Sequence, residues 1–338
     1  MAVSLNIVDN PVGYAPPVGP PIRFTARYGQ RDDFQPANRN YSNFGPKWTF
    51  DWLAYIQDDP ANPAADVQYY MRGGGYRTFN FNQNTQTFAH EQYDQTLLAR
   101  AGNSYQMTFR DGSTLTFAAS DGAIGTVRRV FLTQIADPAG NTLTLTYDSQ
   151  LRVSAITDAI GQVTTLEYSN PADPFKITNV TDPFGRTAIF GYDSSLRLIS
   201  ITDAVGNISQ FTYDSGDFIT AMTTPYGTTQ FVASTVNDPS AGAGDRIRSL
   251  EITYPDGSKE RVEYNQEQST NQLPSSDPTG SVPSGVLTVN DFLTIATPST
   301  GTASSTPTPT STATTARPRS TTGSTPPTRP PLPGFSKA

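Results

Sequence analysis

The sequence predicts an all-β protein built from antiparallel hairpins, followed by a carboxy-terminal tail outside the fold. Three observations lead to this prediction. Apolar and polar residues alternate along short segments, the 26 glycines and 28 prolines provide many turns, and 18 Phe with 16 Tyr supply side chains that favour strands. Because no segment shows a convincing amphipathic helical pattern, we expect little or no helix.

Several short segments before and after the centre of the chain alternate at period two, as half-buried strands do. The first two cover residues 22–28 and 48–52. Hairpins are predicted at 70–81, around three glycines, and at 105–117 and 252–264. The last two turn at Asp-Gly, a strong hairpin signal because glycine adopts a positive φ without a Cβ penalty.

Residues 135–231 contain a repeat with a period of about 21 residues, which is one short supersecondary unit. Each copy opens with an Asp-x-x-Gly turn, replaced by Thr-Pro-Tyr-Gly in the last copy. A tyrosine follows seven residues after each of the first four glycines, and Asp follows that tyrosine in three copies. The repeat positions are Asp137, Gly140, Tyr147, Asp148, Asp158, Gly161, Tyr168, Asp182, Gly185, Tyr192, Asp193, Asp203, Gly206, Tyr213, Asp214 and Gly227.

Each repeat unit is predicted to form one β-hairpin, with Asp accepting backbone N–H bonds and Gly supplying the left-handed position. An apolar residue two positions before each tyrosine shares its sheet face, as Leu145 does with Tyr147. A lone hairpin cannot bury that face, so successive units must pair into one continuous sheet whose aromatic face is covered. Val153 and Ile156 break the alternation, which a β-bulge or burial on both faces would reconcile. A β-propeller is the rival architecture, although propeller blades recur at about 40–50 residues.

The pattern Tyr-Asp-x-x-x-Arg-Leu-x-x-Ile-Thr-Asp-x-x-Gly, as in residues 192–206, resembles the RHS/YD-repeat family. Residues 6–24 and 41–53 also resemble the region that precedes the repeats in large bacterial RHS proteins. In that family the repeats build a long sheet that coils into a hollow shell, which encloses and delivers a carboxy-terminal toxin. The resemblance implies a non-enzymatic, structural protein that is secreted or at a cell surface, and a truncated member with only four to five repeats.

Composition and resemblance together predict four segments. These are a β-rich pre-repeat region (1–134), a YD-repeat sheet (135–264), a linker that could hold one short strand at 286–292 (265–296), and a disordered tail rich in Thr, Ser and Pro (297–338). The tail lacks the apolar side chains that offset chain entropy on folding. It also has four basic residues and no acidic residue, in contrast to the acidic body.

Counting residues excludes several kinds of chemistry. Without cysteine there is no disulfide framework, thiolate nucleophile or Cys-ligated zinc, and the single histidine, His90, is expected to be a surface or edge-strand residue. The net charge of −7 gives no electrostatic footprint for nucleic acid. No apolar run approaches the ~18–20 residues of a transmembrane helix, and the first residues do not resemble a secretory signal. We expect neither a cofactor nor a resident metal ion.

Other interpretations of the same residues stay open. Calcium could bind the repeated aspartates, but turn capping explains each of them without a metal. A pair of carboxylates could hydrolyse glycosides, but nothing singles out two of the 30 acidic residues. The repeat tyrosines could stack on a cell-surface glycan or receptor, although their pairing with an apolar residue favours core packing. Four arginines beside aromatic strands are expected to cover rings or pair with acids: Arg72, Arg77, Arg128 and Arg129.

The partners that the resemblance implies are further RHS repeats or another shell protein, with a toxin cargo or a cell-surface glycan as alternatives. A sheet that ends after five hairpins leaves an unpaired strand, either near 228–232 or within 252–264. Such an edge pairs readily with other strands. We therefore expect the chain to associate, with itself or with a partner.

Overall fold

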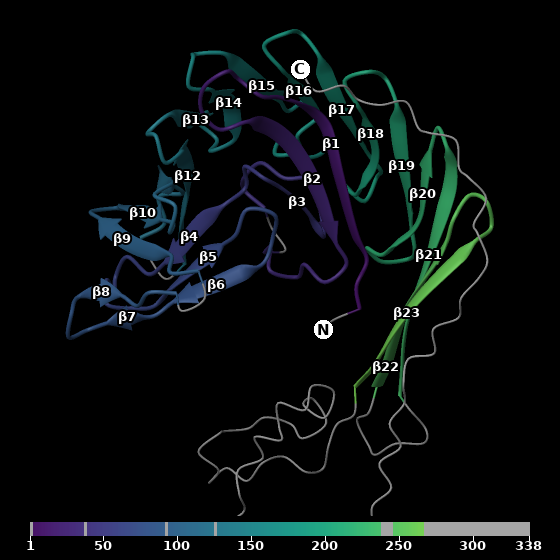
Figure 1. Ribbon diagram of the computed structural model, residues 1–338, viewed down its shortest axis with the longest axis horizontal. Helices are drawn as coiled ribbons and strands as arrows, with labels where there is room; N and C mark the ends of the chain where they lie inside the picture. The colour runs from purple at the N-terminus through teal and green to yellow at the C-terminus, as the bar shows by residue number, and fades with distance from the viewer. Residues whose placement is uncertain (1–2, 37–38, 92–93, 125–126, 238–245, 267–338) are drawn as a thin grey trace, which may run out of the picture. The chain divides into compact units, whose positions relative to one another are not determined.

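The computed structural model describes residues 3–36, 39–91, 94–124, 127–237 and 246–266. These residues contain 23 β-strands and no helix, which confirms the predicted all-β fold (Figure 1). No helix that could cross a membrane is found in this part of the chain. The tail predicted at 297–338, the strand predicted at 286–292 and nearly all of the linker lie outside the described residues.

The amino-terminal segment forms a separate three-stranded antiparallel sheet of β1 (Asn6–Tyr14), β2 (Ile22–Gly29) and β3 (Trp48–Phe50). The strand predicted at 22–28 is β2, and its alternating apolar side chains are buried. The pattern at 48–52 extends beyond its strand, because β3 ends at Phe50 and the buried Trp52 follows it in a turn.

A second, larger sheet branches at β12 (Arg128–Ala136). One edge of β12 pairs with β11 (Thr114–Ser120), which continues through β10 (Ser104–Thr108) to β9 (Leu97–Ala101). The other edge is shared by β13 and by β4 (Tyr55–Asp58), and β4 continues through β5 (Val67–Tyr70) to β6 (Tyr76–Phe79). A small hairpin of β7 (Phe81–Asn82) and β8 (Thr87–Phe88) stands apart.

The repeats continue the larger sheet without interruption, since each strand pairs antiparallel with the next. Each repeat therefore contributes a pair of strands, as predicted. The strands are β13 (Thr142–Tyr147), β14 (Val153–Thr157), β15 (Val163–Glu167), β16 (Asn179–Thr181), β17 (Thr187–Tyr192), β18 (Leu198–Thr202), β19 (Ile208–Tyr213), β20 (Ile219–Thr224), β21 (Gly227–Asn237), β22 (Arg246–Thr253) and β23 (Lys259–Gln266).

A β-bulge recurs at the same place in three repeats. Thr146 lies opposite Ala155, whereas the next residue, Tyr147, lies opposite Val153, so Ser154 is the extra residue. Equivalent shifts precede Tyr192 and Tyr213. The bulge explains how Val153 and Ile156 both become buried despite their spacing of three.

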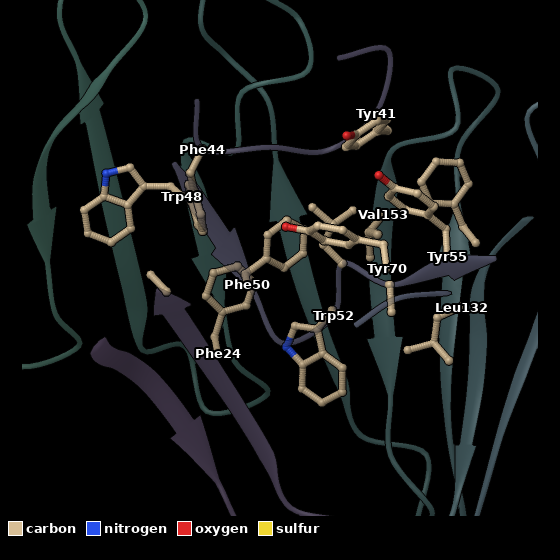
Figure 2. Packing of buried hydrophobic residues seen from close by; sticks show 14 of the residues in the cluster. Phe24, Tyr41, Phe44, Trp48, Phe50, Trp52, Tyr55, Tyr70, Leu132 and Val153 are labelled. Atoms are coloured by element: carbon tan, nitrogen blue, oxygen red, sulfur yellow. The ribbon is translucent and has the colours of Figure 1, made fainter. Parts of the chain in front are cut away.

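The three-stranded sheet covers one face of the repeat strands, which we call the inner face (Figure 1). Aromatic rings from the two sheets meet there: Phe44 lies 4.6 Å from Phe190, and Trp48 lies 5.0 Å from Phe211, between ring centroids. Phe24 contacts Phe190 as well, at 5.8 Å. Figure 2 shows Phe24, Trp48 and Phe50 gathered in this core. The amino-terminal residues thus supply the cover that the aromatic face of the repeats requires.

All described residues belong to one compact unit. The predicted boundary at residue 134 falls inside the larger sheet, because β12 pairs both with β11 before it and with β13 after it. The pre-repeat region and the repeats therefore share one hydrogen-bonded sheet, although they differ in sequence pattern. Their separation into two domains stays a prediction.

Candidate functional site

Most turns between repeat strands have the same five-residue construction. In the turn from Asp193 to Arg197, the Asp193 Oδ1 accepts the backbone N–H groups of Ser195 and Arg197, both at 2.9 Å. The Arg197 Nε donates to Oδ2 at 2.8 Å. Burial acts to raise the pKa of Asp193, but these bonds from Arg197 hold it below its ordinary value. The same Oδ1 bonds occur in the turns that begin at Asp137, Asp148, Asp158, Asp182 and Asp203.

The fourth residue of each of these turns has a positive φ. Four turns place glycine there, with φ between 79° and 91°: Gly140, Gly161, Gly185 and Gly206. The other two place leucine there, Leu151 at 63° and Leu196 at 61°. The left-handed position was predicted for the glycine turns only, because leucine rarely adopts this conformation. The signal that could have located the left-handed leucines is the shared spacing of Asp and Arg four residues apart.

The last two repeat turns differ from the others. Asp214 accepts the same backbone N–H bonds, from Gly216 and Phe218, but the fourth residue of its turn, Asp217, does not have a positive φ, and the Phe218 side chain has no donor for the carboxylate. Gly227, with φ of 120°, follows the tight turn into β21, and a Cβ there would lie 2.6 Å from a side-chain carbon of Pro255. The repeat pattern therefore weakens toward the end of the described sheet.

The four repeat tyrosines form a ladder of identical hydrogen bonds across the sheet. Each hydroxyl donates to the backbone carbonyl oxygen 15 residues earlier in the chain. The pairs are Tyr147 to Leu132 (2.7 Å), Tyr168 to Val153 (2.8 Å), Tyr192 to Ile177 (2.6 Å) and Tyr213 to Leu198 (2.6 Å). Because each bond connects a tyrosine to the preceding repeat, neighbouring hairpins are fixed in register.

Two side chains of the amino-terminal segment extend this ladder. The Trp48 Nε1–H donates to the Tyr213 hydroxyl at 2.8 Å, and the Ser42 and Tyr168 hydroxyls lie 2.6 Å apart. Burial raises the pKa of Tyr192 well above its ordinary value, with smaller contributions from neighbouring charges. The rings pack against the core, and their hydroxyls are already bonded, so they offer little surface for stacking on a sugar.

The first strand of the chain also contacts the Asp-x-x-Gly turns directly. The Tyr14 hydroxyl donates to Asp158 Oδ2 at 3.0 Å, in a turn whose fifth residue, Gln162, bonds to Asp158 through its backbone N–H. The Arg186 guanidinium donates to the Gly13 carbonyl oxygen at 3.0 Å, and Ala204 N–H to that of Pro11 at 2.9 Å. Three successive turns are therefore held to β1.

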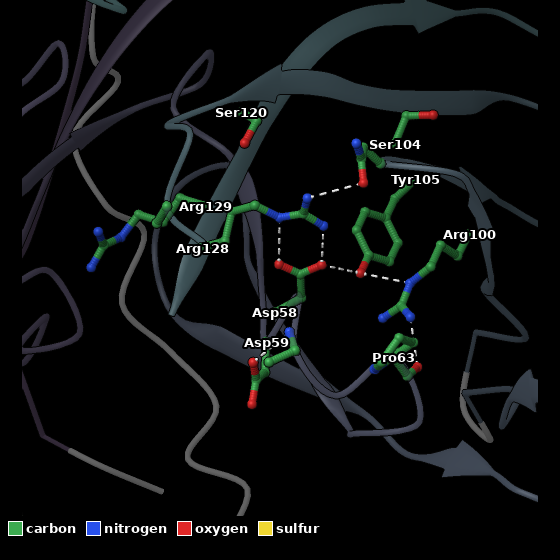
Figure 3. Close-up of polar contacts among 12 residues, drawn as sticks. Asp58, Asp59, Pro63, Arg100, Ser104, Tyr105, Ser120, Arg128 and Arg129 are labelled. Atoms are coloured by element: carbon green, nitrogen blue, oxygen red, sulfur yellow. Dashed lines mark hydrogen bonds and ion pairs between the residues drawn. The ribbon is translucent and has the colours of Figure 1, made fainter. Parts of the chain in front are cut away.

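A buried ion pair joins β4 to β12, where the larger sheet branches (Figure 3). Arg128 donates to both oxygens of Asp58, from Nε at 2.9 Å and Nη2 at 2.5 Å, and the Asp58 side chain is only 1% exposed. Tyr105 donates to Asp58 Oδ2 at 2.6 Å and accepts a bond from Arg100 at 2.9 Å. Burial raises the pKa of Tyr105, and its bond to the carboxylate raises it further. Such a bidentate, fully bonded pair supports a structural role.

The structure also places the remaining arginines and the histidine that the sequence analysis considered. Arg72 covers the ring of Trp52 at 5.5 Å and Arg129 that of Tyr55 at 5.8 Å, whereas Arg77 pairs with an aspartate. His90 is exposed, on the segment after β8. Within the described ranges, no group of three or more His, Asp or Glu side chains is arranged to hold a metal ion.

These features define an all-β repeat protein whose hairpins are fixed in register by a tyrosine ladder and covered by the chain's own first strands. Residues 192–229 match the family model of the RHS repeat. The match confirms, over these residues, the resemblance to RHS/YD repeats predicted from the sequence, and it supports a structural repeat protein. Proteins of this family are typically extracellular or at the cell surface.

Two further comparisons add nothing to this assignment. No curated protein matches the sequence. Among solved structures, a porin-like protein from Bacteroides uniformis ATCC 8492 is 12% identical and matches 67% of this chain and 100% of its own. Its TM-score of 0.27 is too low to carry any argument about fold or function.

Proposed function

We propose that this chain is a non-enzymatic scaffold that forms a closed end of a β-shell in a secreted or cell-surface bacterial protein. In the RHS family such a shell encloses and delivers a carboxy-terminal toxin. The observation that carries the proposal is the occupied inner face. Phe24, Phe44 and Trp48 fill the space beside the repeat strands β17 and β19, so this part of the sheet has no room for a cargo.

A cargo would therefore lie against further repeats, joined beyond the last described strand. β23 pairs only with β22 in the described part of the chain, which leaves its other edge open to a strand. Its residues 259–263 are all exposed, unlike those of the covered repeats. Charged side chains such as Lys259, Arg261 and Glu263 discourage unspecific pairing there, while its open backbone groups can still receive a partner strand.

Light scattering of the full chain over a concentration series tests the open edge. We expect concentration-dependent association through β23, because an unpaired edge is a template for another strand. Val262→Lys should weaken this association at least tenfold, since Val262 is 46% exposed on the edge strand. Val205→Lys is the matched control, because Val205 is exposed in a turn far along the sheet. A monodisperse monomer at every concentration would contradict the proposal.

A further inference from the structure

A cleft of about 400 Å³ lies in the amino-terminal part of the fold and takes no part in the repeat sheet. β1, β2, the segment after β2 and the turn between β5 and β6 all contribute to its walls. Its volume is in the range of small-ligand sites, in which a few fixed polar groups accompany an aromatic surface. The side chains that line it include Asn6, Arg27, Arg31, Asp32 and Phe34.

The turn 73–75 forms a wall of the cleft from backbone alone. All three glycines have positive φ, between 85° and 100°, a conformation that other residues rarely adopt. A Cβ on Gly74 would lie 2.8 Å from Asp32 Oδ2, and a Cβ on Gly73 would lie 3.2 Å from Arg27 Nε. Side chains here would displace the polar groups of the cleft, so the glycines keep those groups close to the wall.

The carboxylate of Asp32 is held in place within the cleft. Its Oδ2 accepts a hydrogen bond from the Tyr70 hydroxyl at 3.1 Å, and its Oδ1 accepts the backbone N–H of Phe34 at 3.3 Å. A carboxylate has about four acceptor positions, and these two bonds leave capacity for ligand hydroxyl groups. Asp32 is half-buried, so its remaining positions are not fully taken up by bulk water.

Phe34 supplies an oriented apolar surface beside these acceptors. Its side chain is 50% exposed, and the ring meets Tyr76 edge-on, with centroids 5.3 Å apart and planes at 85°. An exposed aromatic ring next to fixed hydrogen-bonding groups suits a ligand with one C–H face and several hydroxyls. That mixture of surfaces is the chemistry of a sugar ring.

The charged side chains of the cleft favour a sugar that has a carboxylate group. Arg27 is paired with Asp51 at 3.0 Å, but Arg31 makes no ion pair with any described residue. A guanidinium matches a carboxylate in shape and charge. A doubly charged phosphate would suffer stronger repulsion from Asp32 than a singly charged carboxylate would. We propose that this cleft binds a hexuronic acid unit of an acidic polysaccharide, with Arg31 on its carboxylate, Asp32 on its hydroxyls and Phe34 on its C–H face.

Calorimetric titration of the full chain with defined tetrasaccharides tests the proposal. The hexuronate probes are tetragalacturonate and tetraglucuronate, and the neutral controls are the matching galactose and glucose tetrasaccharides. We expect at least one hexuronate to bind at least tenfold more tightly than its neutral counterpart. Raising the salt concentration should weaken that binding, because it depends on a partly exposed charge pair.

Two variants locate the binding. Arg31→Gln should remove the preference for hexuronate, and Phe34→Ala should weaken binding at least tenfold, whereas Phe184→Ala, another exposed aromatic, should change nothing. Both cleft side chains are exposed, so thermal unfolding should confirm that the variants fold as the parent does. Equal affinity for neutral and acidic sugars, or no binding of either, would overturn the proposal. Neither result would affect the association test of β23.

Discussion

The repeat strands β13–β20 and the last strands β22 and β23 are built from similar hairpins but differ in what covers them. In the first region, inner-face residues such as Phe190 and Leu198 are at most 3% exposed, and tyrosine hydroxyls bond to the neighbouring repeat. In the last hairpin, Leu250 of β22 is still buried, at 6% exposed, whereas residues 259–263 of β23 are exposed on both faces. Backbone pairing runs along both hairpins, interrupted in the first only by the bulge at Tyr192. The difference teaches that the amino-terminal sheet, rather than strand pairing itself, gives the repeats their core.

Truncation of a covered ring should have the largest effect on stability. Phe190→Ala removes contacts with Phe24 and Phe44 and leaves a cavity, so we expect it to lower the free energy of unfolding by about 3–5 kcal/mol. Val262→Ala, on the uncovered hairpin, should change it by less than about 0.5 kcal/mol. Denaturant titrations of both variants measure the difference. Equal losses would contradict the contrast between the regions.

Removal of one hydroxyl group from the tyrosine ladder should have the next largest effect on the free energy of unfolding. Tyr192→Phe leaves the Ile177 carbonyl without this donor, and we expect a loss of about 1–3 kcal/mol in unfolding free energy. The matched change is Tyr254→Phe on the last hairpin, where the exposed hydroxyl bonds to Glu260 at 2.9 Å. That bond is replaced by water at little cost. If Tyr254→Phe costs as much as Tyr192→Phe, the ladder has no special role.

Two turn glycines have similar backbone conformations, so the same substitution at each can distinguish local opening of a hairpin from global unfolding. Gly206 has φ of 91° and Gly257 has φ of 81°, and a Cβ on either meets no atom within 4 Å. Gly206→Ala should lower the global unfolding free energy by about 1–2 kcal/mol through backbone strain. Gly257→Ala carries the same strain but should leave the melting temperature unchanged, because the uncovered hairpin opens by itself. A matching drop in both melting temperatures would show that the regions unfold together.

Alkaline pH should lower the stability of the fold through the covered tyrosines, and the effect of each tyrosine should be the smallest considered. Burial raises the pKa of Tyr192 in the folded chain, so its contribution is fully present below the unfolded value of about 10 and is lost as the pH rises further. Melting temperatures measured from pH 8 to 10.5 should therefore fall at the upper end. The fall should be smaller in Tyr192→Phe. An unchanged slope in that variant would contradict the assignment.

Much of the repeat architecture could be predicted from the sequence because its signals are local. Asp-x-x-Gly turns and the tyrosines seven residues after them predicted the hairpins. The spacing of Val153 and Ile156 indicated either a bulge or burial on both faces, and the structure has the bulge. The ladder from Tyr192 to Ile177 was missed, because its spacing of 15 becomes meaningful only in the paired sheet.

Contacts between distant segments could not be predicted. Alternation at 22–28 showed that one face of that strand is buried, but not that Phe24 packs on Phe190. Likewise, Asp58 and Arg128 are 70 residues apart, and nothing in their local sequences marks them as a pair. The cleft beside Asp32 arises in the same way, from a glycine turn and a loop that are adjacent only in the folded chain.

Native-state hydrogen exchange of the full chain tests the central claim most directly, since it reports the opening free energy of each strand. If the amino-terminal sheet stabilises the repeats, amides of β17–β19 should exchange only through global unfolding, whereas those of β22 and β23 should exchange through a local opening at much lower free energy. Equal protection of β17–β19 and β22–β23 would contradict the claim.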